Sequence, residues 1–180
     1  MMAGATEEEA RARRCDLFRT AVRSGTIAAI AMIPVGLAFY LAGLRVNEYG
    51  PRIVQILFGG LPPGGRFAAF AALHFLISWT ASVPLLLILA TPHRRVPALL
   101  LGAIYGLAFY VAVNSFALPW IFGDSTPWQL GLAVVAPSLI VHLEYGAIIA
   151  ITADGSTRGR TALRSPAERT SSRGRINPGG

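Results

Sequence analysis

Four long apolar blocks constrain what this 180-residue chain can fold into. A transmembrane helix needs about 20 consecutive, mostly apolar residues, because the hydrocarbon core of a bilayer is roughly 30 Å thick. Hydrophobic residues make up 53% of the chain and charged residues only 14%, whereas a soluble domain carries about 25% charged residues. The pattern predicts an all-α integral membrane protein with four spanning helices. The spans are expected at residues 24–44, 66–90, 96–118 and 128–152.

The basic residues predict how the spans are oriented. The net charge is +7, and all 16 basic residues are arginine. Of these, 13 lie before the first span, between the second and third, or after the fourth, and the other three are Arg45, Arg52 and Arg66. Because arginine-rich segments stay on the cytoplasmic side, both termini are predicted in the cytoplasm. The use of arginine without lysine suggests a GC-rich bacterial genome, so the membrane is predicted to be a bacterial inner membrane. A nucleic-acid partner is not expected, since anionic headgroups account for the basic charge.

The segments outside the spans are short. Residues 1–23 and 153–180 are polar and arginine-rich, so they are predicted to be disordered cytoplasmic tails. The first outer loop contains an apolar stretch at residues 51–58, which is too short to span and begins at a proline, as first helical turns often do. It is predicted to form a short interfacial helix on the outer face. The predicted fold is therefore a four-helix transmembrane domain over residues 24–152 with one interfacial helix.

Small residues and prolines indicate how the spans pack. Helices in lipid associate through close backbone approach and polar contacts, which small residues four positions apart allow. Such pairs are Ala38 and Ala42, Ser78 and Ser82, and Gly102 and Gly106. Prolines inside spans are expected to kink the helix and to free a carbonyl one turn earlier. These prolines are Pro34, Pro84 and Pro137.

Polar side chains within spans are candidate functional groups, because they are costly in lipid. On the fourth span, Ser138, His142 and Tyr145 share a face at spacings of three and four residues. The same spacing aligns Asn114 with the small residues of the third span, so the two faces are expected to meet inside the bundle. The candidate intramembrane polar site is His74, Asn114, Ser138, His142, Glu144 and Tyr145.

The roles of these residues stay open at the level of sequence. Each could simply fix helix packing through an interhelical hydrogen bond. His74 and Asn114 are predicted at similar depths and could bond each other. Glu144 lies about 200° around the helix from His142, so it is expected to reach Arg94 or Arg95 or to face a partner.

No catalytic motif is recognisable. The chain contains no phosphate-binding glycine loop, nucleophile elbow or zinc-ligand spacing, and its one cysteine, Cys15, cannot form a thiolate site alone. A b-type haem between His74 and His142 is disfavoured, because the two residues are expected to differ in depth by ~9 Å. An enzyme, a bound metal and a resident cofactor are therefore not predicted.

Two stretches carry a family resemblance. They are residues 101–107 (LGAIYGL), with Asn114 and Pro119 downstream, and residues 142–146 (HLEYG). In these stretches the chain resembles small four-span bacterial inner-membrane proteins of the YagU-like kind. The resemblance covers the four spans without the tails and implies a four-helix membrane fold, with no particular activity. Glu144 is unusual for such proteins.

Three functions follow as hypotheses. The first is a non-enzymatic accessory or structural component that docks on a larger membrane complex. The second is an oligomeric channel or transporter for ions or small solutes that uses His142, Glu144 and Asn114. The third is a haem- or quinone-binding membrane protein. The expected partners are the bilayer and either a larger membrane complex or copies of the chain itself.

Overall fold

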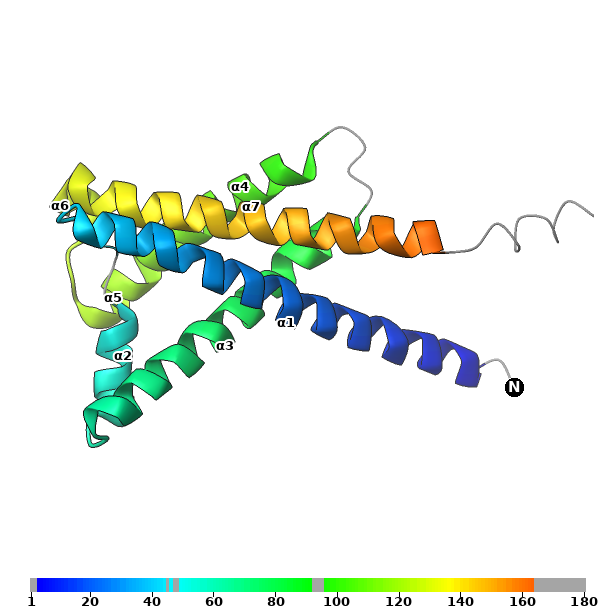
Figure 1. Cartoon of the computed structure of the whole chain (residues 1–180), viewed down its shortest axis with the longest axis horizontal. Helices are drawn as coiled ribbons and strands as arrows, with labels where there is room; N and C mark the ends of the chain where they lie inside the picture. The colour runs from blue at the N-terminus through cyan, green and yellow to red at the C-terminus, as the bar shows by residue number, and fades with distance from the viewer. Residues whose placement is uncertain (1–2, 45, 47–48, 92–95, 164–180) are drawn as a thin grey trace, which may run out of the picture.

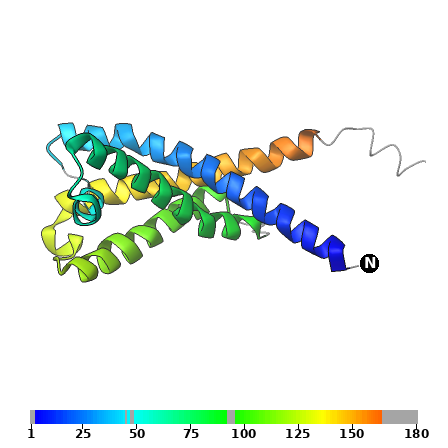
Figure 2. The same ribbon diagram turned by 90° about the horizontal axis from the view of Figure 1, so that it is seen from below.

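The computed structural model describes residues 3–44, 46, 49–91 and 96–163, and within them the chain is helical without strands (Figures 1 and 2). Within the described residues, three short helices and a π-helical segment, η1, accompany the longer helices. The elements are α1 (Ala3–Leu41), α2 (Tyr49–Phe58), α3 (Pro63–Ala90), α4 (Ala98–Phe109), η1 (Tyr110–Ala117), α5 (Leu118–Phe122), α6 (Pro127–Leu130) and α7 (Leu132–Leu163).

Four helices are long and apolar enough to cross a membrane, which confirms the predicted helical bundle with four spans. The third is the continuous run of α4, η1 and α5, and the helices continue through all three interior prolines. In both views α2 lies at the end of the bundle opposite the N-terminus, which we call the α2 end, and α1 and α7 diverge toward the other end (Figures 1 and 2). The span-competent segments are Glu7–Leu41, Pro63–Ala90, Ala98–Phe122 and Leu132–Ala153.

The prediction of disordered tails was wrong for residues 3–23 and 153–163, which continue α1 and α7 as helix. From position 5 to position 23 the chain lacks glycine and proline and is rich in Ala, Glu and Arg, which are strong helix formers. A Glu9–Arg13 ion pair of 3.6 Å bridges one turn, and Ala21 is buried. A helix already nucleated by the span therefore propagates outward. Residues 164–180 lie outside the described residues.

The α1–α3 contact is built on small residues of α1. Ser78 Oγ donates to the Gly25 carbonyl at 2.7 Å, and Ser82 Oγ donates to the Ala21 carbonyl at 3.3 Å. A Cβ on Gly25 would come within 3.0 Å of the Ser78 carbonyl oxygen, so the two backbones nearly touch. The sequence analysis chose the wrong pair on this helix, because Ala38 and Ala42 are exposed. The buried α1 face is Ala21, Ser24, Gly25, Ala28 and Ala29.

The most extensive contact between helices joins α4 and α7. It rests on Gly102 and Gly106 of α4 and Gly146 of α7. A Cβ on Gly102 would overlap the Gly146 carbonyl, and one on Gly106 would overlap the His142 carbonyl. Glycine is therefore required at these positions for the backbones to approach so closely.

At the α2 end, α2 connects the start of α3 to the end of α5. Arg52 forms a 2.5 Å ion pair with Asp124 and lies 4.5 Å from the centre of the Phe122 ring. Tyr49 stacks on the same ring at 5.3 Å. Burial raises the pKa of the Tyr49 phenol, and the Asp124 carboxylate raises it further. The third span ends just before Asp124 at Gly123, whose φ of 65° is the left-handed conformation that glycine adopts at helix ends.

The close contact between α4 and α7 can be tested by adding one methyl group to a glycine in it. Gly106→Ala should destabilise the bundle by about 1–3 kcal/mol, because the added Cβ overlaps a backbone carbonyl that cannot move aside cheaply. Gly36→Ala in α1 is the matched control, since a Cβ there meets nothing within 4 Å. Unfolding of both variants in detergent micelles measures the difference. If Gly106→Ala and Gly36→Ala both have the same free energy of unfolding as the wild type, the close contact between α4 and α7 is absent.

Candidate intramembrane polar site

The π-helical segment η1 brings polar groups of the third span to one face. In a π-helix each backbone bond reaches five residues rather than four, so residues at spacings of four and five share a side. Tyr110, Asn114 and Ser115 are accordingly all buried. Pro119 follows directly in α5 and has no N–H to continue the regular ladder. Segments of this kind occur frequently at functional sites.

Asn114 and His142 form the central contact of the site. The Asn114 Nδ2 lies 2.7 Å from the His142 Nε2, and the His142 Nδ1 lies 2.6 Å from the Ser138 carbonyl oxygen. Since a carbonyl only accepts, the proton must be on Nδ1, which leaves Nε2 to accept from the Asn114 amide. Both ring nitrogens of His142 are thus used within the chain. The sequence analysis expected the two faces to meet, and the structure brings them together.

Aromatic rings surround this contact. Tyr110 meets the His142 ring edge-to-face at a centroid distance of 5.5 Å, and Phe109 stacks on the same imidazole at 5.9 Å. The imidazole is therefore held by two hydrogen bonds and two rings. Such a group is positioned rigidly, as a packing residue or as a fixed hydrogen-bond donor and acceptor.

Tyr145 points to a different neighbour. Its hydroxyl donates to the Ser78 carbonyl of α3 at 2.6 Å, and its ring lies in the core cluster with Leu85 and Ile149. The Tyr105 hydroxyl donates to the Ala81 carbonyl one turn further along α3. Two phenols thus join the α4–α7 pair to α3. Each of these backbone carbonyls accepts a hydrogen bond from a side chain of another helix, which is a polar contact of the kind that holds helices together in lipid.

His74 does not join the site. Its Nε2 lies 3.3 Å from the Ala29 carbonyl of α1, and its ring stacks on Phe70 at 6.3 Å. The expectation that His74 could bond Asn114 was wrong, because Asn114 is turned toward α7 and His74 toward α1. His74 and His142 are thus directed to different helices.

Glu144 also stands apart from the polar contact. It lies ~18 Å along α7 from Leu132 and ~14 Å from Ala153, which is close to the middle of the span. It shares a side of α7 with Ile140 and Ile151, whose side chains are 44% and 57% exposed. Its Oε2 is buried, yet within the described part of the chain this atom has no hydrogen-bond partner. Arg94 and Arg95, which the sequence analysis considered as partners, lie outside the described residues.

Several contributing residues were missed at the level of sequence. The buried small residues of α1 follow the same four-residue spacing that was used elsewhere, so Ala21 with Gly25 could have been found. Ser115 is buried only because of the π turn, and no sequence rule signals that. The long-range pairing of Arg52 with Asp124 had no sequence signal either.

The helices and the polar contacts between them define the class of the protein. Four membrane-competent helices joined by interhelical polar contacts make it a multi-pass α-helical membrane protein. A scan of protein-family models and searches of curated proteins and of solved structures found no significant match. The resemblance to YagU-like proteins therefore stays a prediction.

The Asn114–His142 contact can be measured by a double-mutant cycle. Asn114→Ala and His142→Ala should each destabilise the bundle, with a coupling free energy of about 0.6–1.7 kcal/mol, as interhelical hydrogen bonds in membranes give. Unfolding in detergent micelles supplies the four free energies. Thr80→Ala combined with Asn114→Ala is the control, since Thr80 is exposed and bonds only its own helix. Additive effects of the Asn114 and His142 substitutions would show that the hydrogen bond is absent.

Proposed function

We propose that this chain is a non-enzymatic accessory component of a larger assembly in a bacterial inner membrane. One observation carries the proposal: near mid-membrane, the Glu144 Oε2 has no hydrogen-bond partner in the described residues, and the neighbouring Ile140 and Ile151 on the same side of α7 are exposed. Asn114, His142 and Tyr145 form hydrogen bonds between helices of this chain, whereas the hydroxyls of Ser24, Tyr110 and Ser115 are buried without a partner in the described residues. Glu144 carries the carboxyl group among the buried polar groups left without a partner, and we assign it to a contact with another protein.

The energetics support a partner for Glu144. A charged side chain at the centre of a membrane helix costs roughly 2.5–3.5 kcal/mol on insertion scales, so such residues usually pair with another group. Ile140 and Ile151 flank it at spacings of four and seven residues, which is the stripe that one packed helix covers. A neighbouring transmembrane helix that carries a hydrogen-bond donor or a cation would pair with the carboxyl group of Glu144. The same helix would cover Ile140 and Ile151.

The arginine distribution supports the orientation of this proposal. Thirteen of 16 arginines lie in the two terminal segments and the segment between the second and third spans, and the positive-inside rule favours a cytoplasmic location for such segments. The helical extension of α1 over residues 3–23 would then project an arginine-rich surface from the membrane. Such a surface suits anionic headgroups or acidic segments of a partner.

A second candidate is an oligomeric ion or proton carrier, and the mid-membrane position of Glu144 favours it as well. His142 and Asn114, which the sequence analysis had included in such a pathway, bond each other and surrounding groups. In this version Glu144 alone would bind the ion at an interface between copies of the chain. The two candidates differ in what covers α7.

Co-purification of a tagged chain from its native membrane in mild detergent tests the proposal. The wild type should bring down a different membrane protein in fixed stoichiometry, and Glu144→Leu should reduce its recovery about tenfold or more, as loss of a charged hydrogen bond does. Glu144→Gln should retain the partner if the partner's contacting group is a neutral hydrogen-bond donor, and should lose the partner if that group is a cation. Glu9→Gln is the control, because this exposed carboxyl has the same charge.

The variants must first be shown to fold, by helical content and a single size-exclusion peak. A wild-type chain that purifies only with copies of itself would contradict the accessory role and favour the oligomeric carrier. Equal recovery of the same partner with Glu144→Leu would contradict the role of Glu144.

A further inference from the structure

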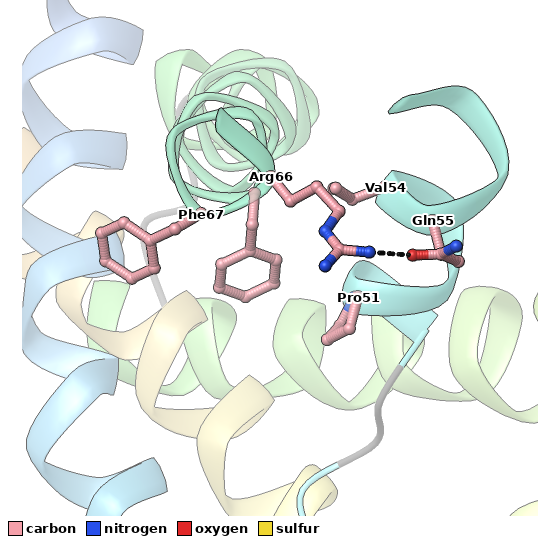
Figure 3. Close-up of a pocket in the computed structure, with 6 residues that line it drawn as sticks. Pro51, Val54, Gln55, Arg66 and Phe67 are labelled. Atoms are coloured by element: carbon pink, nitrogen blue, oxygen red, sulfur yellow. Dashed lines mark hydrogen bonds between the residues drawn. The ribbon is translucent and has the colours of Figure 1, made fainter. Parts of the chain in front are cut away.

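A cleft opens between α2 and the first turns of α3, at the α2 end of the bundle. Its volume is about 250 Å³, which is below the roughly 300–1,000 Å³ of sites that enclose a drug-sized molecule. The cleft therefore suits a small group or one part of a larger ligand. Figure 3 shows Arg66 reaching from α3 toward α2 across the cleft. The lining residues are Pro51, Val54, Gln55, Arg66, Phe67 and Phe70.

Arg66 is the charged group of the cleft, and no carboxylate in the described part of the chain neutralises it. Its Nη1 donates to the Gln55 Oε1 at 3.0 Å (Figure 3). A guanidinium group has five N–H donors, so donors remain for an anion. The contrast with Arg52 is direct, because Arg52 is paired with Asp124.

The start of α3 adds to this positive potential. The helix begins at Pro63, and its N-cap residue Pro62 has no side-chain acceptor for the free backbone N–H groups of the first turn. Helix N-termini carry a partial positive charge and favour anions. Arg66 lies ~5 Å along the helix from Pro63, which is within the first turn over which this partial charge acts.

Apart from Gln55, the remaining wall of the cleft is apolar. Phe67 is 73% exposed and Phe70 is 36% exposed. The neighbouring α2 exposes Ile56 and Leu57 at 64% and 62%, as an interfacial helix does. A ligand with its anion on Arg66 would thus have an apolar surface beside it.

We propose that this cleft binds an anionic phospholipid, with the headgroup phosphate on Arg66 and the first part of an acyl chain against Phe67 and Phe70. The small volume fits this occupant, because the rest of the chain would remain in the bilayer. A free phosphate compound would use Arg66 but gain nothing from the two phenylalanines. The proposal stands independently of the role of Glu144.

Binding to delipidated protein in an uncharged detergent tests it, by native mass spectrometry and by thermal unfolding. Phosphatidylglycerol should bind saturably and raise the Tm. Phosphatidylcholine, whose cationic choline offsets the phosphate charge, and glycerol phosphate, which has no acyl chain to contact the phenylalanines, should each bind at least about tenfold more weakly. Arg66→Gln should weaken phosphatidylglycerol binding by about the same factor, and Arg66→Lys should retain part of it as a point charge. Phe67→Ala should weaken the lipid but not glycerol phosphate.

The matched control is Arg23→Gln, which removes the same charge from an exposed position of α1. It should leave phosphatidylglycerol binding unchanged. Equal weakening by Arg23→Gln and Arg66→Gln would overturn the proposal, because the binding would then follow net charge. Glycerol phosphate binding as tightly as phosphatidylglycerol would also overturn it, in favour of a free phosphate compound.

Discussion

The direct backbone contact between α4 and α7 is the interaction on which the rest of the structure depends. Lipid offers helices no hydrophobic reason to associate, so they must gain from close packing and polar contacts. Gly102, Gly106 and Gly146 let the two backbones meet. That approach brings Asn114 and His142 to 2.7 Å. Larger side chains at the glycines would hold the helices apart and leave these polar groups unpaired in lipid.

The other helices are joined to this pair by side-chain hydroxyls that donate hydrogen bonds to backbone carbonyls of the neighbouring helix. Tyr145 reaches α3 at Ser78, and Ser78 in turn reaches α1 at Gly25. This series of contacts links α7, α3 and α1 beside the hydrophobic core that the same three helices form. Within the described residues, the buried side-chain atoms left without a hydrogen-bond partner are the hydroxyls of Ser24, Tyr110 and Ser115 and the carboxyl oxygen of Glu144.

The sequence predicted the parts of this structure that follow from composition and helical spacing. The four spans come from apolar length, and the meeting of the Asn114 and His142 faces comes from their four-residue periodicity with small residues. The π segment was not predictable, because it depends on how Pro119 and tertiary contacts compete with the regular ladder. The helix over residues 3–23 was missed because polar composition was read as disorder, although propensity and an adjoining span favour helix. The Arg66 cleft needs the fold-back of α2, which no local pattern determines.

The central claim is that Asn114 and His142 hold the helices together through hydrogen bonds. The protonation state of His142 tests this claim most directly. Solid-state NMR of protein with ¹⁵N-labelled histidine in bilayers distinguishes the ring nitrogens, and only three histidines, His74, His93 and His142, need assignment. The structure predicts a proton on the Nδ1 of His142, bonded to the Ser138 carbonyl, and a bare Nε2 whose signal shifts in Asn114→Ala. A proton on Nε2, or an Nε2 signal that is unchanged in Asn114→Ala, would contradict the hydrogen bond. His142 would then be available for a functional role.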